Sequence, residues 1–398
     1  MKLRGRVKLL HTADWHWGAK SWRDSSRSID RNPEIESALK ELLDYAYLNK
    51  PDCILVGGDV FNYPTAPSES DAKKVLSLVI EFSKIAPVVL VLGNHDWKGL
   101  STYDPFSSHI GIRMISKLSS SDDDKPIEDI EGLRIFCFPY FSIRNMLKIY
   151  NLEELQDKAR ESLVSYKNEL KKLTKNDRWN VLLGHFAVDG VPYQNDYTIT
   201  SELFVPKDFL SSELFDYVAL GHIHSQRRVQ GASAQSWYCG SLIRLGFGEE
   251  DNDVGALWVE LSEGEGPKVK PIRLKSSKKL KTFLLDEFDL DRLKELLAGL
   301  DNEDCYVRVI LKLSKGTIYS PVRCRSEILS LDERIVKVEI RKDEVEESLP
   351  IISRGKGLVE MFKEYLKVRG INNEVLVEKF KSYLEKVEKE DETHQDKD

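Results

Sequence analysis

The sequence predicts an α/β protein in which helices cover both faces of a sheet. Strand-like apolar runs, "VKLLHTAD", "DCILVGGD" and "PVVLVLGNHD" among them, alternate with helix-like segments over roughly the first 260 residues. Pro33 to Asn49 has the helical spacing of apolar residues between the first two of these runs, and Ser68 to Ile85 has it before the third. Continuously apolar strands between helices are typical of a sheet buried on both sides, so we expect α/β layering.

The bulk composition limits the class of protein. At 398 residues the chain exceeds one typical core, so we expect a large domain and one or two small ones. The apolar runs are far shorter than the roughly 20 residues of a membrane span, so we expect no membrane association. Five cysteines without a CxxC pair indicate buried free thiols and a cytoplasmic location. A net charge of −7 excludes a surface that is basic everywhere, but a local basic groove could still bind nucleic acid.

Composition shifts along the chain indicate several domains. A long charged helix is expected from about Leu152 to Leu173, and three further strand-like runs, "NVLLGHF", "YVALGHIH" and "GALWVEL", follow it. A basic linker, "EGEGPKVKPIRLKSSKKLK", then leads to a strand–helix–strand–helix–strand pattern typical of a small α+β domain. We therefore expect a first domain over 1–265, a second over 276–345, a helical pair over 350–388 and a disordered tail over 389–398.

Side chains of metal-ligand type follow several of the predicted strands, where ligands gather in doubly wound sheets. Glycines precede four of these residues and allow the backbone to turn sharply there. The complete set is Asp14, His16, Asp59, Asn94, His95, Asp96, His185, His222 and His224.

The number and type of these residues favour two metal ions over one. Apart from His95 and Asp96 they offer four imidazoles, two carboxylates and one amide oxygen, too many for one ion, and Asp59 is the natural bridge between two. Mixed nitrogen and oxygen ligands suit manganese or iron, with zinc as an alternative, whereas magnesium prefers oxygen. A D-x-H pair alone is more often structural, but this many elements placed after strands indicate a dinuclear centre that could clamp a phosphoryl group.

The constellation resembles the calcineurin-like metallophosphoesterases, whose pattern is D-x-H, GD-x-x, GNH[DE], GH and GHxH. Within that superfamily the stretches "LLHTADWHWG", "VLGNHDWKG", "LGHFAVDG" and "YCGSLIRLGFGEE" resemble the SbcD-type nucleases of double-strand-break repair. The resemblance covers roughly residues 7 to 260 with specific motifs. It implies a two-sheet α/β sandwich, a small DNA-binding capping domain and a C-terminal helix-loop-helix.

The resemblance also implies a role for each site residue. Two Mn²⁺ ions are expected per protomer, with Fe, Zn or Mg as alternatives. The first ion would be held by Asp14, His16, Asp59 and His224, and the second by Asp59, Asn94, His185 and His222. His95 would face the phosphate and stabilise or protonate the leaving group, and Asp96 would orient His95. Asn62 stands where the family commonly has His or Asp, which leaves the balance of exonuclease and endonuclease activity open.

Basic and aromatic residues near the metal motifs are candidates for contact with DNA backbone phosphates. Any one of them could instead be an ordinary solvated loop residue. The set is Lys20, Trp22, Arg23, Arg27, Arg31, Lys98, Arg227 and Arg228, with Trp15, Trp17 and Trp97 close by.

Each tail helix carries an apolar stripe that could pack on the protein itself or on a partner. The resemblance favours docking onto an SbcC-type, SMC-like ATPase, and also implies a homodimer. The candidate partner contacts are Leu358, Phe362, Tyr365, Phe380, Tyr383 and Leu384.

These features together predict a manganese-dependent DNA nuclease that processes DNA ends as a 3′–5′ double-strand exonuclease and single-strand endonuclease. A dinuclear phosphatase or cyclic-nucleotide phosphodiesterase is the alternative enzyme. A non-catalytic scaffold is disfavoured because no expected ligand is missing and His95 is present.

Overall fold

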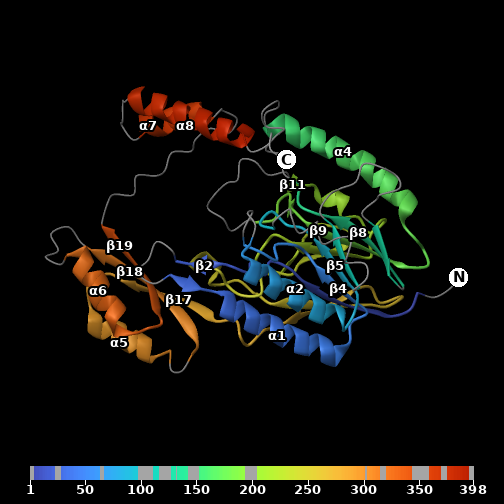
Figure 1. The fold of residues 1–398 in the computed structure, drawn as a ribbon, viewed down its shortest axis with the longest axis horizontal. Helices are drawn as coiled ribbons and strands as arrows, with labels where there is room; N and C mark the ends of the chain where they lie inside the picture. The colour runs from blue at the N-terminus through green and yellow to red at the C-terminus, as the bar shows by residue number, and fades with distance from the viewer. Residues whose placement is uncertain are drawn as a thin grey trace.

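The structure is a computed structural model, and its main body is a pair of stacked six-stranded sheets (Figure 1). It describes residues 4–22, 28–62, 67–96, 111–115, 127–130, 132–141, 152–192, 204–300, 303–313, 320–342, 358–368 and 374–393. Among these residues, no helix has the length and apolar character that a membrane crossing needs.

The first sheet combines a parallel centre with an antiparallel edge. Strands β1, β4, β5 and β6 run parallel, and β15 and β16 continue the sheet antiparallel to β1 and to each other. In spatial order the strands are β16 (Lys268–Ile272), β15 (Ala256–Leu261), β1 (Val7–Thr12), β4 (Cys53–Val56), β5 (Val88–Val91) and β6 (Ile112–Ile115).

The second sheet is likewise parallel at its centre and antiparallel at both edges. Its order is β13 (Arg227–Arg228), β14 (Gln235–Tyr238), β12 (Tyr217–Gly221), β9 (Trp179–His185), β8 (Leu133–Phe138) and β7 (Ile127–Ile130). Two short pairs complete the strands of this body, β2 (Lys20–Ser21) with β3 (Ile29–Asp30) and β10 (Ala187–Val188) with β11 (Phe204–Val205).

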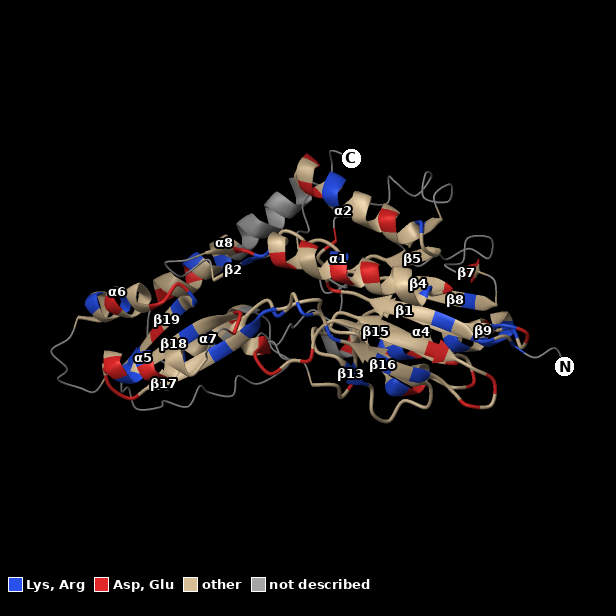
Figure 2. Ribbon diagram, turned by 90° about the horizontal axis from the view of Figure 1, so that it is seen from below, with Lys and Arg blue, Asp and Glu red and all other residues tan. Residues whose placement is uncertain are grey.

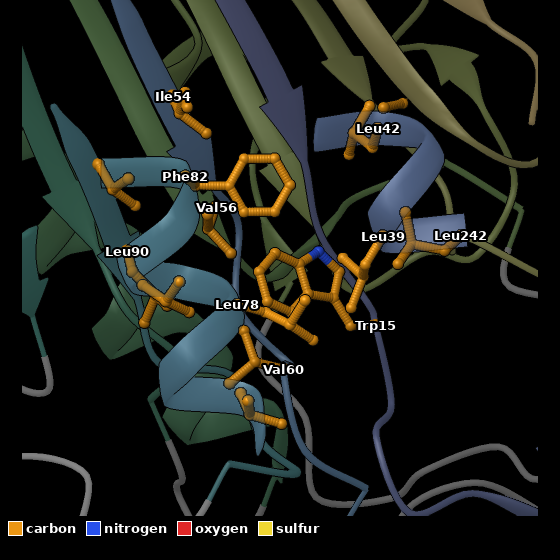
Figure 3. Close-up of a cluster of buried hydrophobic side chains, with 14 of the residues drawn as sticks. Trp15, Leu39, Leu42, Ile54, Val56, Val60, Leu78, Phe82, Leu90 and Leu242 are labelled. Atoms are coloured by element: carbon orange, nitrogen blue, oxygen red, sulfur yellow. The ribbon is translucent and has the colours of Figure 1, made fainter. Parts of the chain in front are cut away.

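Helices cover the outer face of each sheet. Helices α1 (Asn32–Asn49) and α2 (Glu69–Ser83) pack on the first sheet around Trp15 and Phe82 (Figure 3). Helix α4 (Leu152–Leu173) packs on the second sheet through Leu170. Helix α2 begins where the Ser68 hydroxyl accepts the N–H of Asp71, which satisfies a backbone group at the helix start.

The inner faces of the two sheets form one apolar layer. Leu9 and Leu55 from the first sheet pack against Leu183 and Ala219 from the second, and all four are fully buried. The predicted two-sheet α/β sandwich is therefore confirmed.

A third, three-stranded sheet forms the predicted small domain. Its elements are β17 (Lys279–Leu285), α5 (Leu290–Ala298), β18 (Cys305–Leu313), α6 (Pro321–Leu331) and β19 (Ile335–Lys342), in the predicted order. All three strands run parallel, with the helices as crossovers, so this domain is α/β rather than α+β. Part of the predicted basic linker is also regular structure, since β16 lies in it and β17 begins in it.

The described part of the tail is a pair of helices, α7 (Leu358–Val368) and α8 (Glu374–Thr393). Helix α8 continues to Thr393, past residue 389, where the sequence predicts the start of a disordered tail. All five cysteines are buried and free, as predicted.

Candidate metal centre

The strand ends of both sheets meet at one place. Strands β1, β4 and β5 are parallel, so their carboxyl ends share one edge of the first sheet, and β9 and β12 do the same in the second. The two edges touch where the His185 Nδ1–H donates to the Gly57 carbonyl at 2.6 Å. The side chains gathered there are Asp14, His16, Asp59, Asn94, His185, His222 and His224.

Four of these residues have left-handed backbone conformations, which non-glycine residues rarely adopt. The φ angles are 52° at Asp14, 51° at His16, 52° at Asp59 and 94° at His222. Each such residue costs about 1–3 kcal/mol and persists only where the surrounding structure imposes it. The fold therefore holds these side chains in place against a local backbone preference.

On one side of the centre, two histidines face each other through their Nε2 atoms. The Nδ1 atoms of His16 and His224 lie 3.0 Å from Asn62 Oδ1 and 2.7 Å from Glu249 Oε1, which are acceptors, so each Nδ1 carries the hydrogen. In the neutral form of each ring, Nε2 then presents a lone pair, and the two Nε2 atoms are 2.9 Å apart. Two lone pairs this close need a proton or a metal ion between them.

On the other side, ligand-type atoms converge in the same way. Since His185 Nδ1 donates to Gly57, its Nε2 is the nitrogen that faces the centre, and it lies 3.0 Å from Asn94 Oδ1 and 3.4 Å from Asp59 Oδ2. His222 Nδ1 lies 3.0 Å from the same Asn94 oxygen and 3.2 Å from His185 Nε2. These atoms have the arrangement of ligands around a cation.

The distances fit two ions that share a carboxylate. Neighbouring ligands of an octahedral ion with bonds of about 2.1 Å lie about 3 Å apart, close to the contacts on each side. Asp59 Oδ2 lies 3.8 Å from His16 Nε2 and 3.4 Å from His185 Nε2, so one oxygen stands between the two groups. Asp14 also has a donor atom within 4.8 Å of donors in both groups.

The electrostatics of the centre favour positive charge. Burial would lower the pKa of His185, but the Asp59 carboxylate raises it to about 9. Burial would likewise lower the pKa of His224, and Glu249 raises it to about 9. Burial alone would raise the pKa of Asp59, but His185 holds it well below its usual range.

His95 lies beside the first group of ligands. Its ring stands edge-on to the His16 ring with centroids 5.1 Å apart, and burial lowers its pKa. Its backbone N–H donates to Asp59 Oδ1 at 2.8 Å, which fixes the carboxylate whose other oxygen lies between the two groups. His95 is thus close to the centre, and its imidazole is separate from both groups of converging atoms.

The expected role of Asp96 needs correction. Its carboxylate accepts the backbone N–H groups of Asp59 at 2.8 Å, Phe61 at 3.0 Å and Gly93 at 2.8 Å. Within the described residues, no hydrogen bond joins it to His95. Asp96 therefore connects the loop after β4 to the loop after β5, because its carboxylate accepts backbone N–H groups from both loops.

Two polar residues that hydrogen-bond to candidate ligands were not predicted as site residues from the sequence. Asn62, seen only as a departure from the family, anchors His16 through its Oδ1. Glu249 anchors His224, and its only signal in the sequence was its place in "LGFGEE".

One candidate DNA contact lies in the protein interior, and a second is half-buried. Arg31 is fully buried and binds Glu34 through Nε at 3.2 Å and Nη2 at 2.9 Å, so its prediction as a DNA contact is wrong. Trp22 packs against Phe247 and Tyr306, with ring centroids 5.2 Å and 5.0 Å away, between the sandwich and the small domain. The nearby Trp15 and Trp17 are buried too.

The other candidate DNA contacts divide into two groups. Arg23, Arg27 and Lys98 lie outside the described residues. Lys20 lines a cavity of about 350 Å³ at the small domain, and Arg227 and Arg228 line another of about 300 Å³ next to His224.

The apolar residues of the tail helices differ in exposure. Phe362 stacks on Phe380 at 4.2 Å between centroids, so these two hold α7 and α8 together. Tyr365 is 37% exposed and Tyr383 is 65% exposed. The side chains of Leu358 and Leu384 lie outside the described residues.

Comparison with known proteins identifies the family. Residues 7–226 match the calcineurin-like phosphoesterases. Over 267 residues the chain is 25% identical to the SbcD component of the nuclease SbcCD from Staphylococcus epidermidis, with 65% of this chain and 67% of the relative covered. The same component from Staphylococcus saprophyticus is 26% identical, with 64% and 66% covered. A solved dimetal phosphatase from Danio rerio is 12% identical with a TM-score of 0.42, covering 68% of this chain and 99% of its own. Since the family match spans more than half of the sequence, the chain belongs to the calcineurin-like phosphoesterases and is a hydrolase of phosphoester bonds.

Proposed function

We propose that this protein is a manganese-dependent DNA nuclease that processes DNA ends in double-strand-break repair, as a 3′–5′ double-strand exonuclease and a single-strand endonuclease. The observation that carries the proposal is the convergence of ligand-type nitrogen and oxygen atoms from seven side chains on two adjacent points. The similarity to the SbcD component of the nuclease SbcCD supports DNA as the substrate.

The two groups of converging atoms would each hold one ion. Asp14, His16, Asp59 and His224 would hold the first, and Asp59, Asn94, His185 and His222 the second. Nitrogen and oxygen donors in near-octahedral spacing suit Mn²⁺, with iron, zinc or magnesium as alternatives. When bound, the ions would supply Lewis-acid polarisation of the phosphate and a nucleophile from water.

The protein's own residues would orient the phosphate and receive the leaving group. His95 stands at the edge of the centre, bonded to no ligand through its ring among the described residues, and could protonate or stabilise the departing oxygen. Asp96 would keep the two ligand loops at a fixed separation through its three backbone hydrogen bonds.

Two cationic cavities beside the centre support a polymeric phosphate substrate. Lys207, Arg227 and Arg228 line the cavity next to His224, and none of the three forms an ion pair within the described part of the chain. Lys20, Arg308 and Lys337 line the other, of which Asn62 is also part, although Glu339 partly neutralises the last two cations. Basic residues lie on strands of the small domain and acidic ones along α1 (Figure 2). Charges of this kind would bind backbone phosphates without reading bases.

The tail and the dimer belong to the same proposal. The exposed Tyr365 and Tyr383 on the α7–α8 pair would dock onto an SbcC-type, SMC-like ATPase. The nuclease would act as a homodimer in the cytoplasm.

Cleavage of end-labelled linear duplex tests the activity. We expect degradation with Mn²⁺ and none after treatment with a chelator. Rapid hydrolysis of simple phosphomonoesters or cyclic nucleotides, with no DNA cleavage, would instead identify a phosphatase or cyclic-nucleotide phosphodiesterase.

The role of His95 has its own test. His95→Ser should leave metal content near two ions and lower cleavage by roughly 10²-fold or more, the usual range for a general acid. If the bound metal falls along with the activity, His95 is a ligand and the assignment is wrong.

A further inference from the structure

The turn after β14 carries a carboxylate that reaches the metal centre from outside the predicted ligand set. Glu249 ends the short helix η6 (Phe247–Glu249). Its Oε1 accepts the Nδ1–H of His224 at 2.7 Å, and its Oε2 accepts the N–H of Leu245 at 2.7 Å. Both oxygens are therefore engaged, and the side chain is only 17% exposed.

The hydrogen bond decides which nitrogen of His224 faces the centre. With Nδ1 held by Glu249, Nε2 is the nitrogen left to bind an ion, and it points at His16 Nε2, 2.9 Å away. A histidine without such a partner can rotate or change tautomer, and its lone pair then leaves the site.

We propose that Glu249 is a positioning residue for the first ion: it fixes the tautomer and orientation of His224 and makes its Nε2 a stronger donor. This inference rests on the dinuclear site of the proposed function. It assigns a role to Glu249, the first glutamate of "LGFGEE", which is not one of the seven candidate ligands.

The three anchored histidines differ in what anchors them. His16 donates to the neutral amide oxygen of Asn62, and His185 donates to the backbone carbonyl of Gly57. Of these three, His224 alone donates its Nδ1–H to a carboxylate. A negative acceptor strengthens the hydrogen bond and raises the basicity of the imidazole more than a neutral one does. Removing the anchor of His224 should therefore weaken metal binding more than removing the anchor of His16 or His185.

The turn that holds Glu249 also contacts the small domain. Glu250 accepts the backbone N–H of Thr282 at 3.0 Å and the Thr282 hydroxyl at 2.5 Å. Phe247 packs in a cluster with Leu280 and Val336. Neighbouring carboxylates on one turn thus point to different partners, Glu249 to the metal ligand and Glu250 to β17, which makes Glu250 a matched control.

Titration of the metal-free full chain with Mn²⁺ tests the inference. Calorimetry measures the affinity for each ion, and electron paramagnetic resonance shows whether the two ions lie close together. We expect Glu249→Ala to lower the affinity for one of the two ions by about 10–100-fold, the usual effect of losing such an anchor. The affinity for the other ion should stay near that of the wild type. The resonance of the spin-coupled pair should be lost at two equivalents and replaced by that of a single ion. Glu249→Gln should have a smaller effect, because its amide oxygen can still accept the Nδ1–H.

The control variant and the wild type separate the outcomes. Glu250→Ala should bind both ions as the wild type does; if it loses affinity as Glu249→Ala does, the effect belongs to the turn and the inference is wrong. Full affinity for both ions in Glu249→Ala and Glu249→Gln also overturns it. A wild type that binds two ions but does not cut DNA contradicts the proposed nuclease and leaves the Glu249 test intact.

Discussion

Replacing Gly93 by alanine would insert a methyl group directly against the carboxylate at the middle of the centre. A Cβ on Gly93 would lie 2.1 Å from Asp59 Oδ1 and 2.6 Å from Asp59 N, whereas ordinary contact begins at 3.4 Å. The loop is also held by the Gly93 N–H, which donates to Asp96 Oδ2 at 2.8 Å. Because Gly93 cannot easily move away, Asp59 must shift by more than about 1 Å.

That shift is large compared with what the centre tolerates. Asp59 Oδ2 lies 3.4 Å from His185 Nε2 and 3.8 Å from His16 Nε2, so its displacement disturbs both groups of ligands at once. A misplacement of about 1 Å can cost about 10²-fold in rate. Overpacking itself costs about 1–3 kcal/mol of folding free energy, which a domain of this size should survive. We expect Gly93→Ala to stay folded, to bind Mn²⁺ more weakly, and to cut DNA at least about 10²-fold more slowly.

Calorimetric titration with Mn²⁺ and cleavage of linear duplex measure the two effects. Gly5→Ala is the matched control, because the same methyl group there meets nothing within 4 Å. Wild-type metal affinity and cleavage in Gly93→Ala would mean that the two loops are not packed as tightly as the structure has them.

Three further predictions concern stability, pH and partner binding. Arg31→Met should lower the free energy of unfolding by about 3–5 kcal/mol, measured with denaturant, because it leaves Glu34 buried without its partner; an unchanged midpoint would contradict the buried pair. Burial lowers the pKa of His11 to about 3, so the unfolded chain alone takes up a proton as the pH falls below 6.5, and stability is lost between pH 6.5 and 3. In the metal-free protein, His11→Asn should therefore reduce the slope of the free energy of unfolding against pH in that window by up to about 1.4 kcal/mol per pH unit. Equal slopes in the variant and the wild type would refute the lowered pKa of His11. Tyr383→Asp should abolish capture of an SMC-like ATPase and spare DNA cleavage. Tyr47→Asp on α1 is the control, because Tyr47 is similarly exposed. If Tyr383→Asp still captures the ATPase, α8 is not the partner-binding helix.

The fold class and the gathering of ligand-type residues could be predicted from the sequence because both follow from local patterns. Asp14, Asp59 and Asn94 each come directly after an apolar run, and parallel strands necessarily bring such positions to one edge. Helix α4 has the predicted bounds for the same reason, since its spacing is a property of one segment.

What the sequence by itself determined was therefore which residues stand at the strand ends, and only the tertiary structure decided what surrounds them. Arg31 reads as a loop cation, but its contacts with Leu245 and Arg244 come from a segment more than 200 residues away and make it part of the core. In the sequence, Glu249 and Glu250 are two adjacent acidic residues with nothing to distinguish them. Only the folded structure shows that Glu249 contacts His224, just after β12, while Glu250 contacts the small domain. Local spacing encodes the direction of a side chain relative to its own strand or helix, whereas burial and hydrogen-bond partners depend on segments that meet only when the chain has folded.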